Sequence, residues 1–165
     1  MKYKIMSMTE EIARQIAAWK YDGEYAVYNT PPYEVLKEEQ YAITNPHFKD
    51  NYLCFIDQNN QFVGYINLTP KIDQTIVIGI GLAPHACGRG LGYELLTLGV
   101  TIAQERYPNQ LLTLYVRDWN RRAIKCYLRA GFKEVKTETI EAHNGEMMPF
   151  VFMTYIEANE QQVTN

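Results

Sequence analysis

The chain has few cysteines, and none of them suggests a disulfide bond or a bound structural metal. The three, Cys54, Cys87 and Cys126, are odd in number and no two stand in a C-x-x-C spacing. A disulfide framework or a zinc site is therefore not expected. A reducing compartment is the simplest environment for such thiols.

Long apolar runs and a strong excess of one charge are also missing. The longest apolar run, near 76–84, is about half of what a membrane span requires, and the N-terminal MKYKIMSMTEE lacks the apolar core of a signal peptide. Sixteen basic and nineteen acidic residues give a formal net charge of -3, whereas a protein that coats nucleic acid would be strongly basic. We therefore expect a cytoplasmic protein that binds neither membrane nor nucleic acid.

What the chain does have is an ample apolar content and many tyrosines. Its 165 residues are 47% hydrophobic, which suits one compact domain over 1–158 with a polar tail over 159–165. The thirteen tyrosines are half-apolar side chains that each favour a wet edge or a hydrogen-bond partner. We expect some of them to line a cleft.

Periodicity and turn residues predict a mixed order of strands and helices. The predicted elements are a strand over 2–8, a helix from Thr9 to about 22, a tyrosine-rich loop over 24–33, a helix over 34–43, strands over 52–56, 62–68 and 76–82, a helix over 93–107, a strand over 111–116, a helix opened by Asn120 and closed by Gly131, and strands over 133–141 and 150–156. This order indicates an α/β (α+β) fold whose sheet is mostly antiparallel, with one parallel crossover around the 93–107 helix.

A glycine-rich stretch, Gly88-Arg89-Gly90-Leu91-Gly92, joins a strand to a helix. Glycines let the backbone turn sharply and bring its N–H groups close to a ligand, and a helix start offers free donors and partial positive charge that suit phosphate. The spacing fits neither G-x-G-x-x-G, because Tyr93 stands where the last glycine belongs, nor a P-loop, which needs Lys-Ser/Thr. A turn that only packs helix against strand is the structural alternative.

A second motif follows about thirty residues later, with Asn120, Ala123, Ile124, Tyr127 and Gly131-Phe132 in order. In this motif, and in Pro84 followed by the glycine stretch, the chain resembles the GNAT superfamily of N-acetyltransferases over roughly 56–152. The resemblance implies a GNAT-like mixed sheet flanked by helices, with a splayed central strand pair. It also implies acetyl-CoA as co-substrate and no metal.

The resemblance assigns roles to individual residues. The main chain of Leu82, Ala83 and Pro84 would bond the pantetheine arm, and Asn120 would hydrogen-bond it. Tyr127 would also contact the cofactor and, as the catalytic acid, protonate the leaving thiolate; a tyrosine hydroxyl, whose ordinary pKa is about 10, is a proton donor at neutral pH. The residues that would hold the pyrophosphate are Cys87, Gly88, Arg89, Gly90, Leu91, Gly92, Tyr93 and Glu94. The structural alternatives are a core tyrosine at 127 and a plain helix cap at 120.

Two positions depart from the family pattern. Cys87 stands where Gln or Arg is usual, so one side-chain contact to phosphate is lost while the main-chain cradle remains. Tyr115 stands where some members carry the glutamate that deprotonates the amine, and 75–76 offers no acid either. A water relay to Asp118, Glu24 or Asp22 and a substrate amine that arrives neutral both stay open. Direct attack by the amine is simpler than an acyl intermediate on Cys87.

The acceptor is expected to meet the N-terminal part, where tyrosines alternate with acids. Glu24 and Tyr28, together with Tyr115, are the predicted substrate contacts, since carboxylates and aromatic rings attract a protonated amine. The alternative is that these tyrosines pack the helix junction. The sequence thus predicts an N-acetyltransferase for a primary amine of a small molecule or peptide, and it leaves a homodimer open. A catalytically weak acyl-CoA-binding module and a nucleotide-binding fold are the alternatives.

Overall fold

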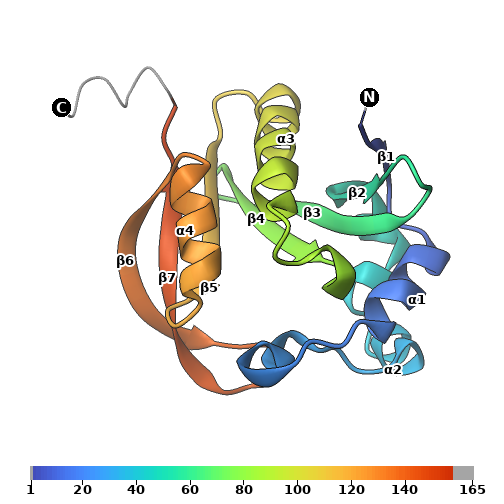
Figure 1. Cartoon of the computed structure of the whole chain (residues 1–165). Coiled ribbons are helices and arrows are strands. Elements are labelled where there is room, and N and C mark those ends of the chain that lie inside the picture. Colours follow the sequence, from blue (N-terminus) through green and yellow to red (C-terminus); the bar gives the residue numbers. More distant parts are fainter. Residues whose placement is uncertain (1, 158–165) are drawn as a thin grey trace. The chain divides into compact units, whose positions relative to one another are not determined.

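The computed structural model describes residues 2–157, so the predicted tail over 159–165 lies outside the described residues. The strands form a seven-stranded sheet in the order β1-β2-β3-β4-β5-β7-β6, and four α-helices accompany it (Figure 1). The strands are β1 (Lys4–Met6), β2 (Tyr52–Ile56), β3 (Phe62–Pro70), β4 (Thr75–Leu82), β5 (Leu111–Arg117), β6 (Phe132–Glu141) and β7 (Met147–Tyr155). The helices are α1 (Glu10–Ala18), α2 (Tyr33–Glu38), α3 (Leu91–Arg106) and α4 (Arg121–Arg129).

The sheet is mixed, as predicted. β4 and β5 run parallel, with α3 as the crossover between them, while β1–β2, β2–β3, β5–β7 and β6–β7 are antiparallel. The register between β4 and β5 covers only Thr75↔Leu111 to Val77↔Thr113, although both strands continue beyond it. The parallel pair is therefore joined at one end only, which confirms the expected splayed pair.

The described residues divide into two compact units. Residues 2–67 and 80–91 form the first unit, and residues 68–79 and 92–157 form the second. β3 and β4 each contribute to both. The prediction of a single domain over 1–158 stays a prediction. Among residues 2–157, no helix is both long and apolar enough to cross a membrane.

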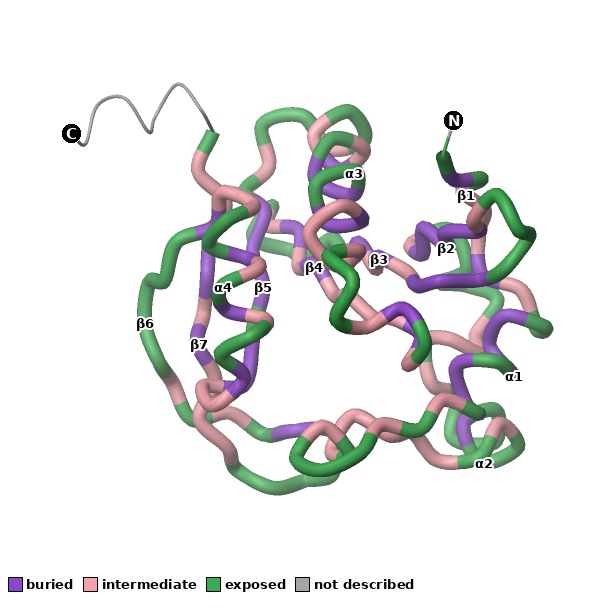
Figure 2. Tube along the Cα trace, in the orientation of Figure 1, coloured by how far each residue is buried: buried purple, intermediate pink, exposed green. Residues whose placement is uncertain are grey.

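In the first unit α1 covers an apolar cluster. Thr9 caps the helix, its Oγ1 accepting a hydrogen bond from the Ile12 N–H at 3.2 Å. The buried stripe Ile12, Ala13, Ile16 and Ala17 lies on one face, which Figure 2 shows as the purple stretches of α1. The start of this helix at Thr9 was predicted from the sequence. The helix ends at Ala18, a few residues earlier than expected.

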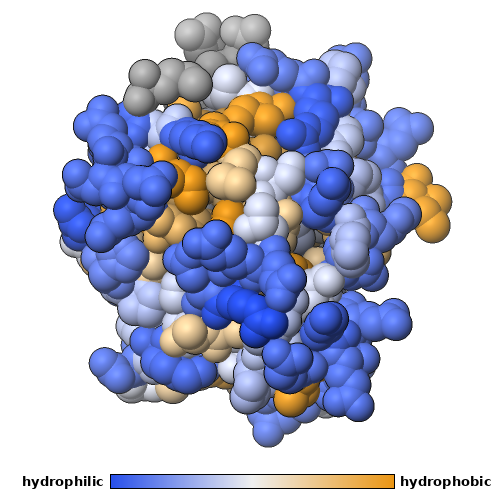
Figure 3. Space-filling view, turned by 90° about the vertical axis from the view of Figure 1, so that its right-hand side faces the viewer, coloured by the Kyte–Doolittle hydropathy of each residue, from blue (hydrophilic) through white to orange (hydrophobic). Residues whose placement is uncertain are grey.

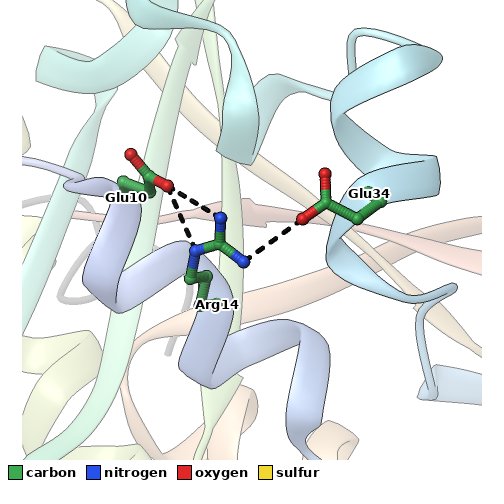
Figure 4. A network of polar contacts seen from close by, with 3 residues as sticks. All are labelled: Glu10, Arg14 and Glu34. Atoms are coloured by element: carbon green, nitrogen blue, oxygen red, sulfur yellow. Dashed lines mark hydrogen bonds and ion pairs between the residues drawn. The ribbon is translucent and has the colours of Figure 1, made fainter.

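An ion network ties α1 to α2 in the same unit. Arg14 donates hydrogen bonds to Glu10 at 2.9 and 3.1 Å and to Glu34 at 3.3 Å (Figure 4). Its guanidinium lies over the Tyr33 ring, 4.0 Å from the centroid. The two carboxylates raise the pKa of Arg14. Because these side chains are largely exposed, the network orients α2 more than it stabilises the fold.

Three sequence predictions in this unit were wrong in extent. The helix expected over 34–43 ends at Glu38, because Gln40 takes a φ of 56° and the chain continues as a 3₁₀ helix, Ala42–Thr44. The segment expected as a loop over 24–33 contains a 3₁₀ helix, Gly23–Tyr28. The first strand covers only Lys4–Met6 rather than 2–8.

In the second unit α4 packs beside β6, and β6 and β7 form a long hairpin (Figure 1). The turn predicted at 143–146 is present: the Gly145 N–H donates to the Ala142 carbonyl at 2.9 Å, and Gly145 has a φ of 83°. α3 begins at Leu91, two residues before its predicted start. Its buried side is formed by Leu95, Leu96, Gly99, Val100 and Ala103.

Candidate active site

The end of β4 is already hydrogen-bonded within the first unit. The carbonyl of Leu82 accepts a hydrogen bond from the Tyr21 hydroxyl at 2.5 Å. The N–H of Ala83 donates to the carbonyl of Val63 at 2.9 Å. Of the groups predicted to bond a pantetheine arm, the Ala83 N–H is therefore engaged, whereas the Leu82 oxygen has a second lone pair. Pro84 contributes no donor and starts a 3₁₀ turn, Pro84–Ala86.

The glycine loop has the backbone that its sequence predicts. Gly88 and Gly90 have φ values of 73° and 77°, in the left-handed region that L side chains rarely adopt. A Cβ built on either glycine would meet nothing within 4 Å. These glycines are therefore needed for backbone shape and leave open space beside the loop. Cys87 is half-buried, and its thiol lies 3.5 Å from the Ala83 carbonyl that accepts from it.

The loop leads directly into the first turn of α3, which contains Leu91, Gly92, Tyr93 and Glu94. The first N–H groups of a helix have no partner inside it and carry partial positive charge. The side chain of Tyr93 is occupied otherwise, since the guanidinium of Arg129 at the end of α4 lies 4.1 Å from its ring centroid. Its predicted role concerns the main chain and is unaffected by that contact.

Asn120 and Tyr127 lie together on α4. Asn120 is the N-cap residue: its Oδ1 accepts from the Ala123 N–H at 3.1 Å. It is only 7% exposed, so its amide is buried as well as capping. Tyr127 shares the buried side of the helix with Ile124 and is 8% exposed. Both positions stay predictions for cofactor contact and acid catalysis, and the cap and the buried ring are in place.

The predicted acceptor residues fall into both units. Glu24 is exposed and Tyr28 half-buried on the Gly23–Tyr28 turn of the first unit. Tyr115, on β5 of the second unit, is 39% exposed. Its ring lies 5.0 Å from that of Phe152 on β7. The first unit also contains the chain from Leu82 to Leu91, and the second contains Gly92 to Glu94, Asn120 and Tyr127.

A carboxylate that the sequence did not reveal lies beside Tyr115. Burial chiefly raises the pKa of Tyr115, and the hydrogen bond and negative charge of Glu138 on β6 raise it further. Glu138 also pairs with Lys136 at 3.2 Å. Glu138 thus brings a carboxylate within hydrogen-bonding distance of the Tyr115 hydroxyl. No local pattern indicates it, because the pairing of β5, β7 and β6 decides which side chains meet.

An aromatic group in the first unit was also missed. Trp19, at the end of α1, stacks on Phe62 at 5.3 Å and on Tyr65 at 6.2 Å. Tyr65 presses against Gly81 on β4, where an added Cβ would overlap its ring. Burial raises the pKa of Tyr65 to about 12. Gly81 in an apolar strand was the one visible sign, because a strand glycine often marks close approach of another group.

Two of the three cysteine thiols have pKa values raised by burial. Cys54 is fully buried, and burial raises the pKa of its thiol to about 12. Burial also raises the pKa of Cys126. Within the described part of the chain, no three His, Cys, Asp or Glu side chains gather in a way that could hold a metal ion.

Comparison with known proteins gives a family match over most of the chain. The model of the acetyltransferase (GNAT) family matches residues 13–132. Mycothiol acetyltransferase from Renibacterium salmoninarum is 30% identical over 98 residues, which are 56% of this chain and 29% of that protein. The protein of the same name from Mycolicibacterium smegmatis is 30% identical over 97 residues, 56% of this chain and 32% of that protein. The chain therefore matches about a third of the length of these relatives.

Solved structures show the same fold at lower identity. A spermidine N-acetyltransferase chimera from Vibrio cholerae superposes with a TM-score of 0.78 at 19% identity, covering 98% of this chain and 99% of that one. Ribosomal-protein-S5-alanine acetyltransferase from Vibrio fischeri gives a TM-score of 0.67 at 14% identity, covering 97% and 96%. At these identities the similarity concerns the fold.

Proposed function

Because the chain belongs to the acetyltransferase (GNAT) family, we propose that it transfers an acetyl group from acetyl-CoA directly to a primary amine of a small molecule or peptide. The observation that carries the proposal is the glycine loop. Two glycines at positive φ, Gly88 and Gly90, have open space beside them and lead into the start of a sixteen-residue helix. That arrangement suits a pyrophosphate, which needs several N–H donors at close range.

Acetyl-CoA supplies an activated thioester, and the residues of this chain hold and orient it. The N–H groups from Arg89 to Glu94 hold the pyrophosphate, and the Leu82 carbonyl accepts from the pantetheine arm. Asn120 hydrogen-bonds the same arm. The amine nitrogen forms a bond to the acetyl carbon, the carbon–sulfur bond breaks, and the departing sulfur takes a proton from the Tyr127 hydroxyl.

The amine must also lose a proton, and the chain offers two groups of candidates. Tyr115 with Glu138 forms one, through the hydrogen bond between them. The other comprises Asp22, Glu24 and Asp118, each acting through water. The names of similar proteins mention spermidine, an alanine of a ribosomal protein and mycothiol, and the first two suggest a polyamine and an alanine amine as acceptors to test. We propose that Glu24 and Tyr28 contact the amine.

The test is thiol release from acetyl-CoA with spermidine and with a peptide that begins with alanine. We expect one of these amines to accelerate release, and Tyr127→Phe to lower kcat by about 10²–10⁴-fold while CoA affinity is kept. Tyr107→Phe, a tyrosine at the end of α3, is the matched control. CoA binding without release would indicate an acyl-CoA-binding module. A wild-type rate in Tyr127→Phe would remove Tyr127 as the acid.

A further inference from the structure

The segment that follows α1 closes on itself through one side chain. The amide of Asn29 bonds the main chain of Tyr21 twice: Oδ1 accepts from the Tyr21 N–H at 2.7 Å, and Nδ2 donates to the Tyr21 carbonyl at 3.4 Å. The Asn29 N–H donates to the Ala26 carbonyl at 3.0 Å. Residues 21–29, here called the Tyr21–Asn29 loop, are thus held at both ends, and they include Glu24 and Tyr28.

The side chain of Tyr21 leaves this loop and bonds the end of β4. Its hydroxyl donates to the Leu82 carbonyl, 61 residues along the chain, at 2.5 Å, the short end of the range for such bonds. Two residues earlier, Trp19 is fixed by stacking on Phe62 and Tyr65 of β3. The approach of Tyr21 to Leu82 is therefore set before any ligand binds.

The same carbonyl belongs to the strand end that is proposed to bond the pantetheine arm. A carbonyl oxygen has two lone pairs, so Leu82 can accept from Tyr21 and from the arm together. A second donor restricts the motion of the carbonyl, and that restriction reaches the Tyr21–Asn29 loop through the phenol. The Leu82 carbonyl therefore links the strand end proposed to bind the CoA arm with the loop that contains Glu24 and Tyr28.

We propose that Tyr21 is a positioning residue: through the Leu82 carbonyl it couples binding of the CoA arm to the order of the Tyr21–Asn29 loop. This inference rests on the proposed function, since it takes the end of β4 as the arm's binding strand. Coupling of this kind is reciprocal, so an amine held by the ordered loop also strengthens CoA binding.

The test uses CoA alone as the probe and needs no knowledge of the amine. Hydrogen exchange of the amides of residues 22–29 is followed by mass spectrometry with and without saturating CoA. We expect CoA to slow exchange by about five-fold or more in the wild-type chain and by less than about two-fold in Tyr21→Phe. Calorimetry establishes that each variant binds CoA and that saturation is reached.

Tyr41→Phe is the matched control, because it also removes one tyrosine hydroxyl but at a position outside the loop. In this variant CoA should slow the exchange of residues 22–29 as much as in the wild type. Tyr21→Phe retains the ring, and an unchanged melting temperature shows that a lost response is not unfolding. CoA binding with an equal slowing in Tyr21→Phe, or with none in the wild type, overturns the coupling alone. A wild-type chain that gives no CoA binding overturns the proposed function and the coupling together.

Discussion

The hydroxyl of Thr30, next to Asn29, has no hydrogen-bond partner among the described residues although it is buried. A buried polar atom without a partner costs about 1–3 kcal/mol of desolvation. The nearly isosteric change Thr30→Val removes that cost while it keeps the volume. We expect the variant to be more stable by about 1 kcal/mol, measured as the free energy of unfolding in urea.

Thr44→Val is the control for this prediction, because the Thr44 hydroxyl lies within bonding distance of the carbonyls of Leu36 at 3.0 Å and Tyr41 at 2.9 Å. There the same substitution should destabilise the chain by about 1 kcal/mol. A loss of stability in Thr30→Val equal to that in Thr44→Val would show that the Thr30 hydroxyl is hydrogen-bonded in solution.

At the residue scale, features that depend only on neighbouring residues were predicted correctly from the sequence. Thr9 and Asn120 were predicted as helix caps and make those hydrogen bonds, because a cap depends on the next three residues alone. The bond between Tyr21 and Leu82 joins residues 61 positions apart. This bond could not be predicted, because composition shows how many tyrosines need partners but not which partner each one reaches.

At the scale of elements, β4 requires a residue without a side chain at position 81. A Cβ at Gly81 would overlap the Tyr65 ring, which Trp19 and Tyr52 hold from other sides. We expect Gly81→Ala to destabilise the chain by about 1–3 kcal/mol through overpacking, measured by thermal unfolding. The overlap arises from the ring and not from the backbone, since Gly81 is not among the positive-φ glycines.

A double-mutant cycle tests that cause. Shortening the ring in Tyr65→Leu should make the further change Gly81→Ala nearly neutral, because the atoms that clash are then gone. If the losses of stability in Tyr65→Leu and Gly81→Ala simply add in the double variant, Gly81 is required for another reason.

Elements with strong periodicity were predicted well, and short ones were not. β2 has the predicted bounds, and α4 lies between its predicted cap and its closing glycine. The second predicted helix was overextended, since nothing in its composition marks Gln40 as the residue that takes a positive φ. The parallel pair followed from order and resemblance, whereas the pairing of Tyr115 with Glu138 needed the strand register.

At the scale of the whole molecule, stability should depend on pH on the alkaline side. Burial raises the pKa of Cys54 from 9.0 to about 12 and that of Tyr65 from 10.0 to about 12. Between those values the unfolded chain loses protons that the folded chain retains, so stability falls as pH rises. We expect a constant urea midpoint up to about pH 8.5 and a steady decline between pH 9 and 12.

Tyr65→Phe should flatten the upper part of this decline, because one of the raised pKa values disappears while the ring remains. Tyr155→Phe on β7 is the comparison variant and should keep the wild-type slope. An identical pH profile in Tyr65→Phe would contradict the assignment.

One face of the molecule can be compared with the balanced composition of the chain. The face drawn in Figure 3 is mostly hydrophilic, with apolar side chains in limited areas. The sheet order leaves β1 and β6 at the two edges. β6 carries exposed charges along most of its length, and charged edges resist further strand pairing. The homodimer that the sequence left open can be tested by a measurement of mass in solution.

The three thiols differ enough in environment to serve as internal reporters. Cys54 is sealed in the apolar cluster, and Cys126 is half-buried with a raised pKa, so an alkylating reagent at neutral pH should modify both slowly. Cys87 stands immediately before Gly88, half-buried beside the open space of the glycine loop. The unaltered chain thus carries a labelling position at the proposed pyrophosphate cradle, where a fluorophore or isotope tag can register occupancy without any engineered residue.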